Sequence, residues 1–381
     1  MVFLLFYFFS NFQETKEKER IYDFSADFRT LEKFGLPFYQ LQNFLKKADR
    51  PENLKISESF IAREGKDKKY NLIFIQVESL DTSIIMEKYK EEPVMPYLYK
   101  LKDQSIFYPY VISYHYGGGT SDCEFSIFNS LEPLFDFPSI KLLNYDYRNS
   151  FLKILREEGY KIKAFHGNEG KFWNRSYAFP AMGFEEFYDI KKMGLKMKGW
   201  GASDEEVFGF MLDKLKLEKK PFFYFIITMS SHMPFTNVKN YFNDKKFEGL
   251  ENRVLRNYFS SMCYVDGVLE KYVEEFLKIP DTYIFIYGDH VGIYRENGFE
   301  GGFLEMEGLK IEFVPLIVLT PERKVYKEEK FVVSFLDFAP TALFSSGVSF
   351  KYFTEGQNLL DFPIKNTKIS PFFKKFDRQE L

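Results

Sequence analysis

Short runs of apolar residues recur along the chain and are separated by segments of helical periodicity. The run Asn71–Val77 is almost continuously apolar, which is typical of a strand covered on both faces of a sheet. Similar runs follow at 106–112, 161–165, 222–228, 282–287 and 313–319. Strands that alternate with helices predict an α/β fold: a doubly wound, mostly parallel sheet flanked by helices, with a smaller C-terminal α+β portion.

Two helices have clear sequence signals. Ser203 followed by Glu206 is a capping box, and it predicts a helix that begins at this point. Between 254 and 276, apolar residues recur every three or four positions, which predicts one buried face of a long helix. Both helices fit the alternating α/β pattern.

The two ends of the chain differ from this central part. Residues 1–9 are all apolar but too few to span a bilayer, so we expect 1–10 to be the end of a transmembrane helix, with a buried N-terminal strand as the alternative. Residues 11–69 are predicted to form a juxtamembrane helical linker, with an amphipathic helix at 36–47 that packs on the main domain or lies on a membrane surface. We expect a catalytic domain at 70–347 and a C-terminal extension at 348–381.

Charge and cysteine content exclude several classes of function. The formal net charge is −3, so no broad basic field exists and nucleic acid is not expected as a partner. The chain has two cysteines and no CxxC spacing, which excludes a zinc knuckle and a dithiol redox motif. Cys123 and Cys263 are both expected to be free thiols.

All four histidines follow strand-like runs. His166, His232 and His290 each lie just beyond the carboxyl end of a run, and His115 follows another after a few residues. A single histidine is more often structural than functional. In a doubly wound sheet, however, the carboxyl ends of the strands border the ligand crevice. Four histidines at equivalent edges therefore indicate one site.

Acidic residues and a glycine-rich turn occur at the same predicted edge. Glu78 ends the first run, and Asp289 precedes His290 at the end of another. Carboxylates together with neutral histidine suit Mn²⁺, Mg²⁺ or Zn²⁺. Three glycines precede Thr120, so the backbone there can turn sharply and direct amide groups at an anion. Taken alone, Thr120 is more often a helix cap, but beside these carboxylates it becomes a candidate nucleophile.

Several segments resemble the lipoteichoic acid synthases, which are phosphoglycerol transferases of the sulfatase/alkaline phosphatase superfamily. The resemblance covers about 71–347 in the family's order, and the combination of motifs is specific. The matching segments are IQVES at 75–79, GTSDCEF at 119–125, HGN at 166–168, FWNR at 172–175, SHMPF at 231–235, YGDHVG at 287–292 and DFAPT at 337–341.

The resemblance implies a role for each matching residue. It implies metal ligation by Glu78, Thr120, Asp289 and His290, with Mn²⁺ as the usual metal and Mg²⁺ or Zn²⁺ as alternatives. It also implies a pocket for the glycerophosphate head group. That pocket is lined by His166, Trp173, Arg175 and His232, and His115 is a further candidate for substrate contact. One position departs from the family pattern: lysine commonly precedes the nucleophilic threonine, whereas this chain has Gly119.

The implied reaction transfers glycerophosphate from phosphatidylglycerol through a covalent phosphoglyceryl-threonine. In this interpretation Thr120 is the nucleophile, Arg175 offsets phosphate charge, and His232 or His166 moves the proton. The acceptor would be a glycolipid, a polyglycerophosphate-type polymer or a glucan. The family's catalytic domain is tethered at the cell membrane, on the extracellular or periplasmic side. The alternatives are a phosphodiesterase, a phosphoethanolamine transferase and a catalytically silent sensor of lipid head groups.

Overall fold

The computed structural model describes residues 54–364, except 136, 143, 220, 243–244, 297, 307–308 and 329–330. The predicted end of a transmembrane helix at 1–10, the helix at 36–47 and the tail from 365 lie outside these residues. Within the described part of the chain, no helix combines the length and the apolar character that crossing a bilayer requires.

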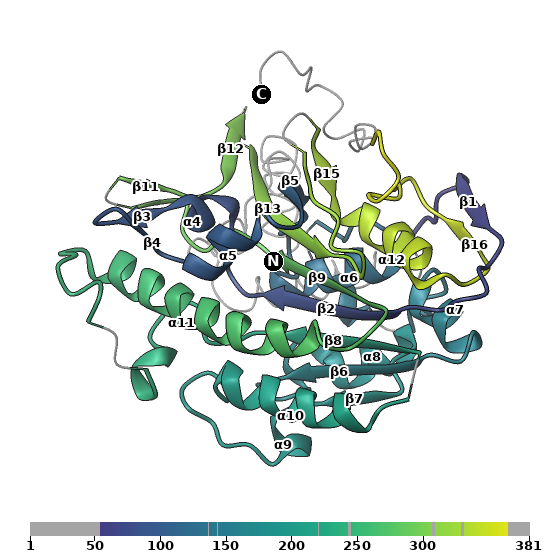
Figure 1. The fold of residues 1–381 in the computed structure, drawn as a ribbon, viewed down its shortest axis with the longest axis horizontal. Helices are drawn as coiled ribbons and strands as arrows, with labels where there is room; N and C mark the ends of the chain where they lie inside the picture. The colour runs from purple at the N-terminus through teal and green to yellow at the C-terminus, as the bar shows by residue number, and fades with distance from the viewer. Residues whose placement is uncertain are drawn as a thin grey trace, which may run out of the picture.

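A ten-stranded mixed sheet forms the centre of the molecule (Figure 1). Its main path runs β14-β5-β13-β9-β2-β8-β6-β7, while β12 (Phe303–Met306) pairs with β13 and β15 (Val333–Ser334) pairs with β5. The strands on the path are β14 (Tyr326–Lys327), β5 (Ile106–Ser113), β13 (Leu309–Leu319), β9 (Thr282–Gly288), β2 (Asn71–Val77), β8 (Phe222–Ile227), β6 (Lys161–His166) and β7 (Glu186–Tyr188). The six predicted strands are all confirmed.

Strand direction decides which residues meet at one edge of this sheet. β2 runs parallel to both β8 and β9, and β6 runs parallel to both β8 and β7. β13 runs antiparallel to β9 on one side and to β5 on the other. β5 therefore points the same way as β9, and the carboxyl ends of β2, β5, β6, β8 and β9 lie at one edge. The amino-terminal half of β13 lies at that edge as well.

Helices cover both faces of the sheet, as the near-continuous apolar strands predict. Alternate residues of β2 belong to different cores: Ile73 and Ile75 pack on one face, and Leu72 and Phe74 pack on the other. The first face carries α4 (Thr82–Met86), α5 (Pro96–Leu101), α10 (Asp204–Leu217) and α11 (Arg253–Phe276). The second carries α6 (Thr120–Asn129), α7 (Phe151–Glu157), α8 (Arg175–Met182) and α12 (Phe338–Ser346). Figure 1 shows α10 and α11 side by side.

Local signals in the sequence account for both predicted helices. The Ser203–Glu206 capping box is present at the start of α10, and α11 covers the predicted segment. Neither Cys123 nor Cys263 forms a disulfide with a residue that the structure describes, as expected. The doubly wound α/β fold class is confirmed.

The remaining elements are short. β1 (Phe60–Arg63), in the described end of the expected linker, pairs with β16 (Phe350–Phe353) of the C-terminal extension. The others are β3 (Lys88–Tyr89), β4 (Glu92–Pro93), α9 (Ile190–Met193), β10 (Arg295–Glu296), β11 (Phe299–Glu300) and the 3-10 turns η1 (Ser139–Lys141), η2 (Phe172–Asn174), η3 (Asn237–Asn240) and η4 (Phe335–Asp337).

Candidate active site

The carboxyl edge of the sheet gathers the predicted acidic residues and histidines. Glu78 follows β2, and Asp289 and His290 follow β9. His166 is the last residue of β6, while His115 and His232 lie in the loops after β5 and β8. The structure therefore brings these side chains to a common edge, as the pattern of strand ends predicts.

Thr120 and the three candidate metal ligands form one contact network. The Thr120 hydroxyl donates to Glu78 Oε2 at 3.1 Å. The other carboxylate oxygen of Glu78, Oε1, lies 3.1 Å from His290 Nε2. Asp289 Oδ2 lies 3.7 Å from the same nitrogen. A hydroxyl, two carboxylates and an imidazole are thus close enough to share one cation.

Hydrogen bonds to backbone groups orient Asp289 and His290 so that one ligand atom of each faces the Glu78 carboxylate. Asp289 Oδ1 accepts from the amides of Ser79 and His290, both at 2.8 Å. Asp289 Oδ2 is buried and has no hydrogen-bond partner among the described residues. His290 Nδ1 donates to the Val291 carbonyl at 3.0 Å, so Nε2 is the nitrogen available to a metal. The donor set fits Mn²⁺, Mg²⁺ or Zn²⁺.

The electrostatics of the site also favour a cation. Burial, together with the charge of Glu78, raises the pKa of Asp289 well above its usual value. Burial would lower the pKa of His290, but Asp289 and Glu78 outweigh it and raise that pKa. Burial would raise the pKa of Glu78, but His290 outweighs it and lowers that pKa. The metal-free site therefore holds protons in place of a cation.

The affinity of the site for Mn²⁺ is expected to fall as pH falls. Because the pKa values of Asp289 and His290 are both raised, a cation must displace protons from the site when it binds. For each pH unit below neutrality, we expect the apparent dissociation constant for Mn²⁺ to rise about tenfold per proton that the ion displaces. Mn²⁺ titration followed by electron paramagnetic resonance between pH 6 and pH 8 measures this. Affinity that stays constant over the range would contradict it.

Glycine places Thr120 at the first position of helix α6. Gly119 has φ 52° and ψ −135°, a conformation that other residues rarely adopt. At Gly118, a Cβ would lie 2.1 Å from Asp122 Oδ1, so this position also requires glycine. Asp122 Oδ2 accepts from the amides of Gly118 at 2.8 Å and Tyr116 at 3.0 Å. The turn is thereby fixed, and the hydroxyl of Thr120 faces Glu78 at a helix amino terminus.

Arg175 has a buried carboxylate partner. Its side chain is 1% exposed, and its Nε lies 2.9 and 3.0 Å from the two carboxylate oxygens of Glu124 on α6. Its Nη2 also contacts Glu124 Oε1. The predicted phosphate ligand is thus tied to the helix that begins with Thr120.

Breaking this ion pair from one side is expected to destabilise the fold. Glu124→Gln leaves the Arg175 charge buried and uncompensated, which costs about 3–5 kcal/mol. Chemical denaturation of the purified protein measures this change in the free energy of unfolding. The double variant Glu124→Leu/Arg175→Met removes both charges and should recover most of the loss. A loss as large as that of Glu124→Gln would show that the charges themselves stabilise the protein.

His166 and His232 border the site on the side of β6 and β8. Burial, and then the charge of Arg175, hold the pKa of His166 well below its usual value, so this imidazole is neutral. His232 Nδ1 donates to the Met233 carbonyl at 2.7 Å, which leaves Nε2 free to exchange a proton. Its ring stacks on Trp200, with centroids 5.0 Å apart. Trp200 itself is 44% exposed.

A buried carboxylate on α10 holds the loop that carries His232. Asp204 accepts from the amides of Met229 at 2.7 Å and Ser230 at 3.1 Å. Burial raises the pKa of Asp204 to about 6.

Trp173 and His115 lie on the two sides of Gly119. A Cβ built on Gly119 would be 3.5 Å from Trp173 Cζ2 and 3.8 Å from His115 Nε2. Lys141 lies 4.6 Å from the centroid of the Trp173 ring. The space where the family carries a lysine side chain is therefore bordered here by an indole and an imidazole.

Glu312 is a site residue that the sequence did not reveal. It is buried, and it accepts from His115 Nδ1 at 2.9 Å and from the Val291 amide at 2.7 Å. The His115 ring stacks on His290 with centroids 4.2 Å apart and an angle of 15°. Glu312, His115 and His290 are close enough to hold an ion, but lone pairs of stacked rings run parallel and do not converge on one. Glu312 is better explained as a group that orients both imidazoles.

Replacing Glu312 with glutamine is expected to lower turnover about 10- to 100-fold, as for other groups that orient metal ligands. The amide retains the size of the side chain but loses the charge that holds His115 and the loop after His290. Steady-state kinetics measures kcat and KM. The exposed Glu300→Gln serves as a control. Equal activity of the two variants would exclude the orienting role.

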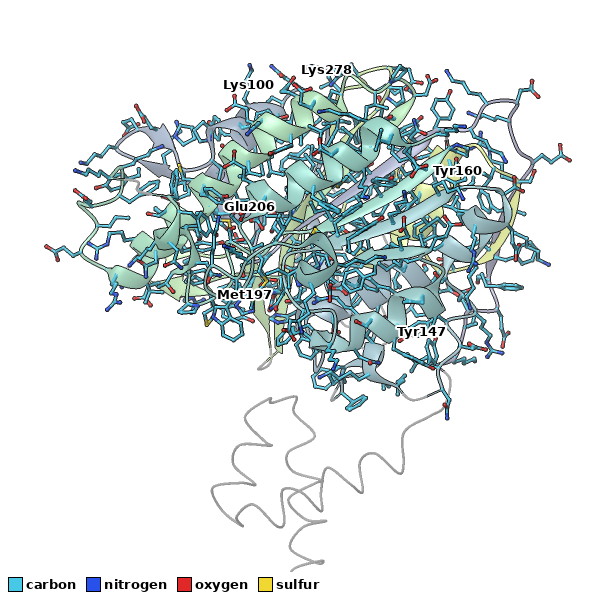
Figure 2. The ribbon with its side chains drawn as sticks, turned by 90° about the horizontal axis from the view of Figure 1, so that it is seen from below. Lys100, Tyr147, Tyr160, Met197, Glu206 and Lys278 are labelled. Carbon is cyan, nitrogen blue, oxygen red and sulfur yellow. The ribbon has the colours of Figure 1, made fainter. Side chains whose placement is uncertain are left out.

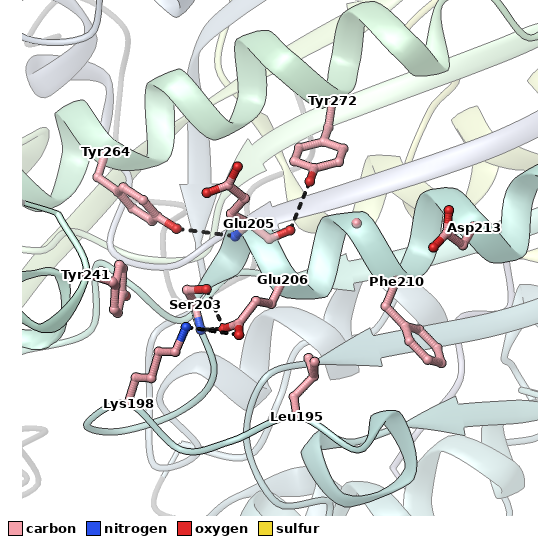
Figure 3. Close-up of a pocket in the computed structure, with 11 residues that line it drawn as sticks. Leu195, Lys198, Ser203, Glu205, Glu206, Phe210, Asp213, Tyr241, Tyr264 and Tyr272 are labelled. Carbon is pink, nitrogen blue, oxygen red and sulfur yellow. Dashed lines mark hydrogen bonds and ion pairs between the residues drawn. The ribbon is translucent and has the colours of Figure 1, made fainter.

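A separate pocket of about 470 Å³ lies between α10 and α11 (Figure 3). Its polar groups already have partners: the Tyr264 hydroxyl accepts from the Glu205 amide at 3.3 Å, and Tyr272 donates to the Glu205 carbonyl at 3.1 Å. Glu206 pairs with Lys198. These pocket groups bind one another, whereas Asp289 Oδ2 of the candidate active site has no hydrogen-bond partner among the described residues.

Comparison with known proteins identifies the family of this chain. Residues 70–348 match the family model of the sulfatases. Lipoteichoic acid synthase 2 of Bacillus subtilis is 29% identical over 360 residues, which cover 88% of this chain and 54% of that protein. Lipoteichoic acid synthase of Staphylococcus saprophyticus is 33% identical over 244 residues, which cover 61% and 38%. The chain thus spans about half or less of the length of these two relatives.

Solved structures share the fold. The lipoteichoic acid synthase LtaP of Listeria monocytogenes matches with a TM-score of 0.67 and 25% identity, over 76% of each chain. A protein of the alkaline phosphatase superfamily from Vibrio parahaemolyticus matches with a TM-score of 0.65 and 19% identity, over 87% of this chain and 80% of that one. Because the family model matches residues 70–348, we conclude that this chain belongs to the sulfatase family, and its sequence is similar to lipoteichoic acid synthases.

Proposed function

We propose that this chain is a metal-dependent phosphoglycerol transferase. It takes glycerophosphate from phosphatidylglycerol, holds it covalently on Thr120 and delivers it to a glycolipid, a teichoic-acid-like polymer or a glucan. The observation that carries the proposal is the contact of the Thr120 hydroxyl with Glu78, whose other oxygen faces His290 beside the unpartnered oxygen of Asp289. The names of the relatives, lipoteichoic acid synthases, support the same reaction class.

Glu78, Thr120, Asp289 and His290 are the residues that would hold the metal. We propose Mn²⁺, with Mg²⁺ and Zn²⁺ as alternatives that the same donor set accommodates. Such a cation, when bound, stabilises the deprotonated form of a hydroxyl and offsets charge on phosphate oxygens.

The Thr120 hydroxyl releases its proton to solvent before the donor reacts, and the deprotonated oxygen is regenerated at the end of the second half. In the first half of the reaction, this oxygen attacks phosphorus in line with the diacylglycerol oxygen. The new Thr120 O–P bond forms as the bond from phosphorus to diacylglycerol oxygen breaks. His232 donates a proton to the departing oxygen through its free Nε2. The neutral imidazole of His166 and the guanidinium of Arg175 lie on the same side of the site.

In the second half, the acceptor hydroxyl loses its proton to His232 and attacks the same phosphorus. The bond from phosphorus to Thr120 breaks, and the nucleophile is restored. Trp173 and His115 border the space beside Gly119 and would contact the glycerol portion of the head group. Arg175 would offset charge on the phosphate oxygens, and its ion pair with Glu124 fixes it against the helix that begins with Thr120.

The substrates imply where the reaction takes place. A phospholipid donor and a glycolipid acceptor are both found at a membrane surface, so we propose that the chain works at the cell membrane with its catalytic domain on the extracellular or periplasmic side. Nucleic acid has no part in this reaction.

A screen of donors and acceptors tests the proposal. The full chain is incubated with Mn²⁺ and phosphatidylglycerol or phosphatidylethanolamine, with and without a glycolipid acceptor, and released diacylglycerol is separated by thin-layer chromatography. We expect release from phosphatidylglycerol that increases when acceptor is present. Release of free glycerophosphate, unaffected by acceptor, would identify a phosphodiesterase instead. Turnover of phosphatidylethanolamine alone would identify a phosphoethanolamine transferase, and no turnover of either lipid would favour a silent sensor.

A further inference from the structure

Four large apolar side chains are exposed on segments that carry or contact residues of the candidate active site. We call them the apolar rim: Phe172, Met197, Trp200 and Met233, which are 39%, 53%, 44% and 60% exposed. Isolated exposed apolar residues are ordinary on protein surfaces, whereas a cluster beside a site usually marks an interaction surface. The question is therefore whether these four belong together.

A shared groove and a ring contact join the rim to the site. Phe172, Met197 and Trp200 line one groove of about 440 Å³, with Asn168, Asn237 and Asn240 between them. Trp200 stacks on His232, the residue directly before Met233. The Asn237 carboxamide accepts from the Trp200 amide at 3.0 Å and fixes the loop that presents the indole.

The segments that carry the rim are uniformly basic. Residues 170–182, 195–200 and 232–242 contain lysine and arginine but no aspartate or glutamate, although the whole chain has a net charge of −3. Lys171, Lys196 and Lys239 are exposed, and none forms an ion pair with a residue that the structure describes. Positive charge without internal partners thus borders the apolar groups.

We propose that the apolar rim and these three lysines dock on an anionic phospholipid bilayer. Apolar side chains that enter the headgroup region, flanked by lysines that face anionic lipid, are the two contributions from which interfacial membrane binding is built. A soluble polyanion would satisfy the lysines but would leave four apolar side chains in water. This surface explains how a lipid donor reaches Thr120, and in that respect it rests on the proposed function. The docking itself does not.

Vesicle binding by the full chain tests the surface. The probes are vesicles of phosphatidylcholine alone and of phosphatidylcholine mixed with phosphatidylglycerol, and binding is measured by co-sedimentation. Met197→Asp is expected to weaken binding to the mixed vesicles about tenfold, since it removes one apolar side chain that would enter the bilayer and adds a negative charge. Lys196→Glu should weaken it by about tenfold as well. Figure 2 shows Met197 on the opposite side of the molecule from Lys278.

Two matched changes outside the rim serve as controls. Leu217, at the end of α10, is 82% exposed, and Lys219 is exposed just after it. Leu217→Asp and Lys219→Glu should bind vesicles as the wild type does. The N- and C-terminal segments are identical in all variants and contribute equally to any vesicle binding. A difference in binding between a rim variant and its control therefore reports the rim alone. Equal binding by rim and control variants would overturn the proposal.

Tryptophan fluorescence gives an independent measurement. The chain has two tryptophans, the exposed Trp200 and the half-buried Trp173. Phospholipids brominated in their acyl chains should quench the emission on binding, and Met197→Asp should reduce the quenching. Binding that depends on anionic lipid without any quenching would indicate a charged polymer as the natural partner, and it would refute docking by the rim.

The outcome separates docking from catalysis. With a short-chain phosphatidylglycerol that stays monomeric, Met197→Asp should turn over donor at the wild-type rate, while its turnover of vesicle donor falls with its binding. If neither donor is turned over but the vesicle binding still differs between rim and control variants, the surface stands and the proposed function fails. If both donors are turned over equally by all variants and binding does not differ, the function stands and the surface fails.

Discussion

Replacing Thr120 with alanine is expected to lower glycerophosphate transfer by about 10⁴-fold, the loss that removal of a catalytic nucleophile typically causes. The hydroxyl is the group that contacts Glu78, and no neighbouring nucleophile takes its place: the adjacent Ser121 hydroxyl donates to the Gly118 carbonyl instead. Intact mass spectrometry after incubation with phosphatidylglycerol and Mn²⁺ should detect a glycerophosphate adduct on the wild type and none on Thr120→Ala.

Serine is the matched control at this position. Thr120→Ser keeps a hydroxyl at the amino terminus of α6 and should retain the adduct and measurable turnover. An adduct on Thr120→Ala would place the covalent intermediate on another residue. No adduct on any variant, together with normal turnover, would favour direct transfer between donor and acceptor.

Replacing Asp289 with asparagine is expected to remove both the metal response and about 10³-fold of the activity, since it leaves a neutral amide among the ligands. Mn²⁺ at 100 times its dissociation constant stabilises a protein by about 2.7 kcal/mol, which should raise the Tm of the wild type by several degrees. The variant should show no such rise. Without metal it should melt at or above the Tm of the wild type, because asparagine replaces a carboxylate whose charged form is disfavoured by burial and by the charge of Glu78.

Differential scanning calorimetry with added Mn²⁺, and then with a chelator, measures both effects. Asp213→Asn is a suitable control, because Asp213 is an exposed carboxylate that pairs with Lys216 on the surface of α10. It should respond to Mn²⁺ as the wild type does. A normal Mn²⁺ response of Asp289→Asn would show that the ion binds elsewhere.

Much of the fold could be predicted because its strands are buried on both faces. A strand covered by helices on each side must be apolar throughout, and this is why β2 and β8 stand out as continuous runs in the sequence. Helix α10 was recognisable because its capping box consists of residues close in sequence. The short strand β1 gave no comparable signal. It pairs with β16, almost 300 residues away, and its residues alternate between exposed and half-buried positions.

Part of the site was equally accessible. Glu78 and His290 come directly after apolar strands, and parallel strands deliver their carboxyl ends to one edge. The role of Trp200 could not be predicted, because its exposure and its stacking on His232 depend on how the loop after α9 lies against the loop after β8. The partnership of Arg175 with Glu124 was also missed, since it joins the middle of α6 to the first residue of α8 and the two residues are 51 positions apart.

The sequence by itself determined the elements and the groups that follow them: apolar runs long enough for strands, a glycine turn before Thr120, and carboxylates and imidazoles at the strand ends. These follow from local rules, since backbone conformation and burial leave their mark on neighbouring residues. Only the tertiary structure decided which further polar groups contact these carboxylates and imidazoles. Glu312 reaches the site because β13 runs antiparallel to its neighbours, so that its amino-terminal half, and not its carboxyl end, meets His115 and the loop after His290. Strand direction depends on the connections between distant segments, and no local pattern of residues records it.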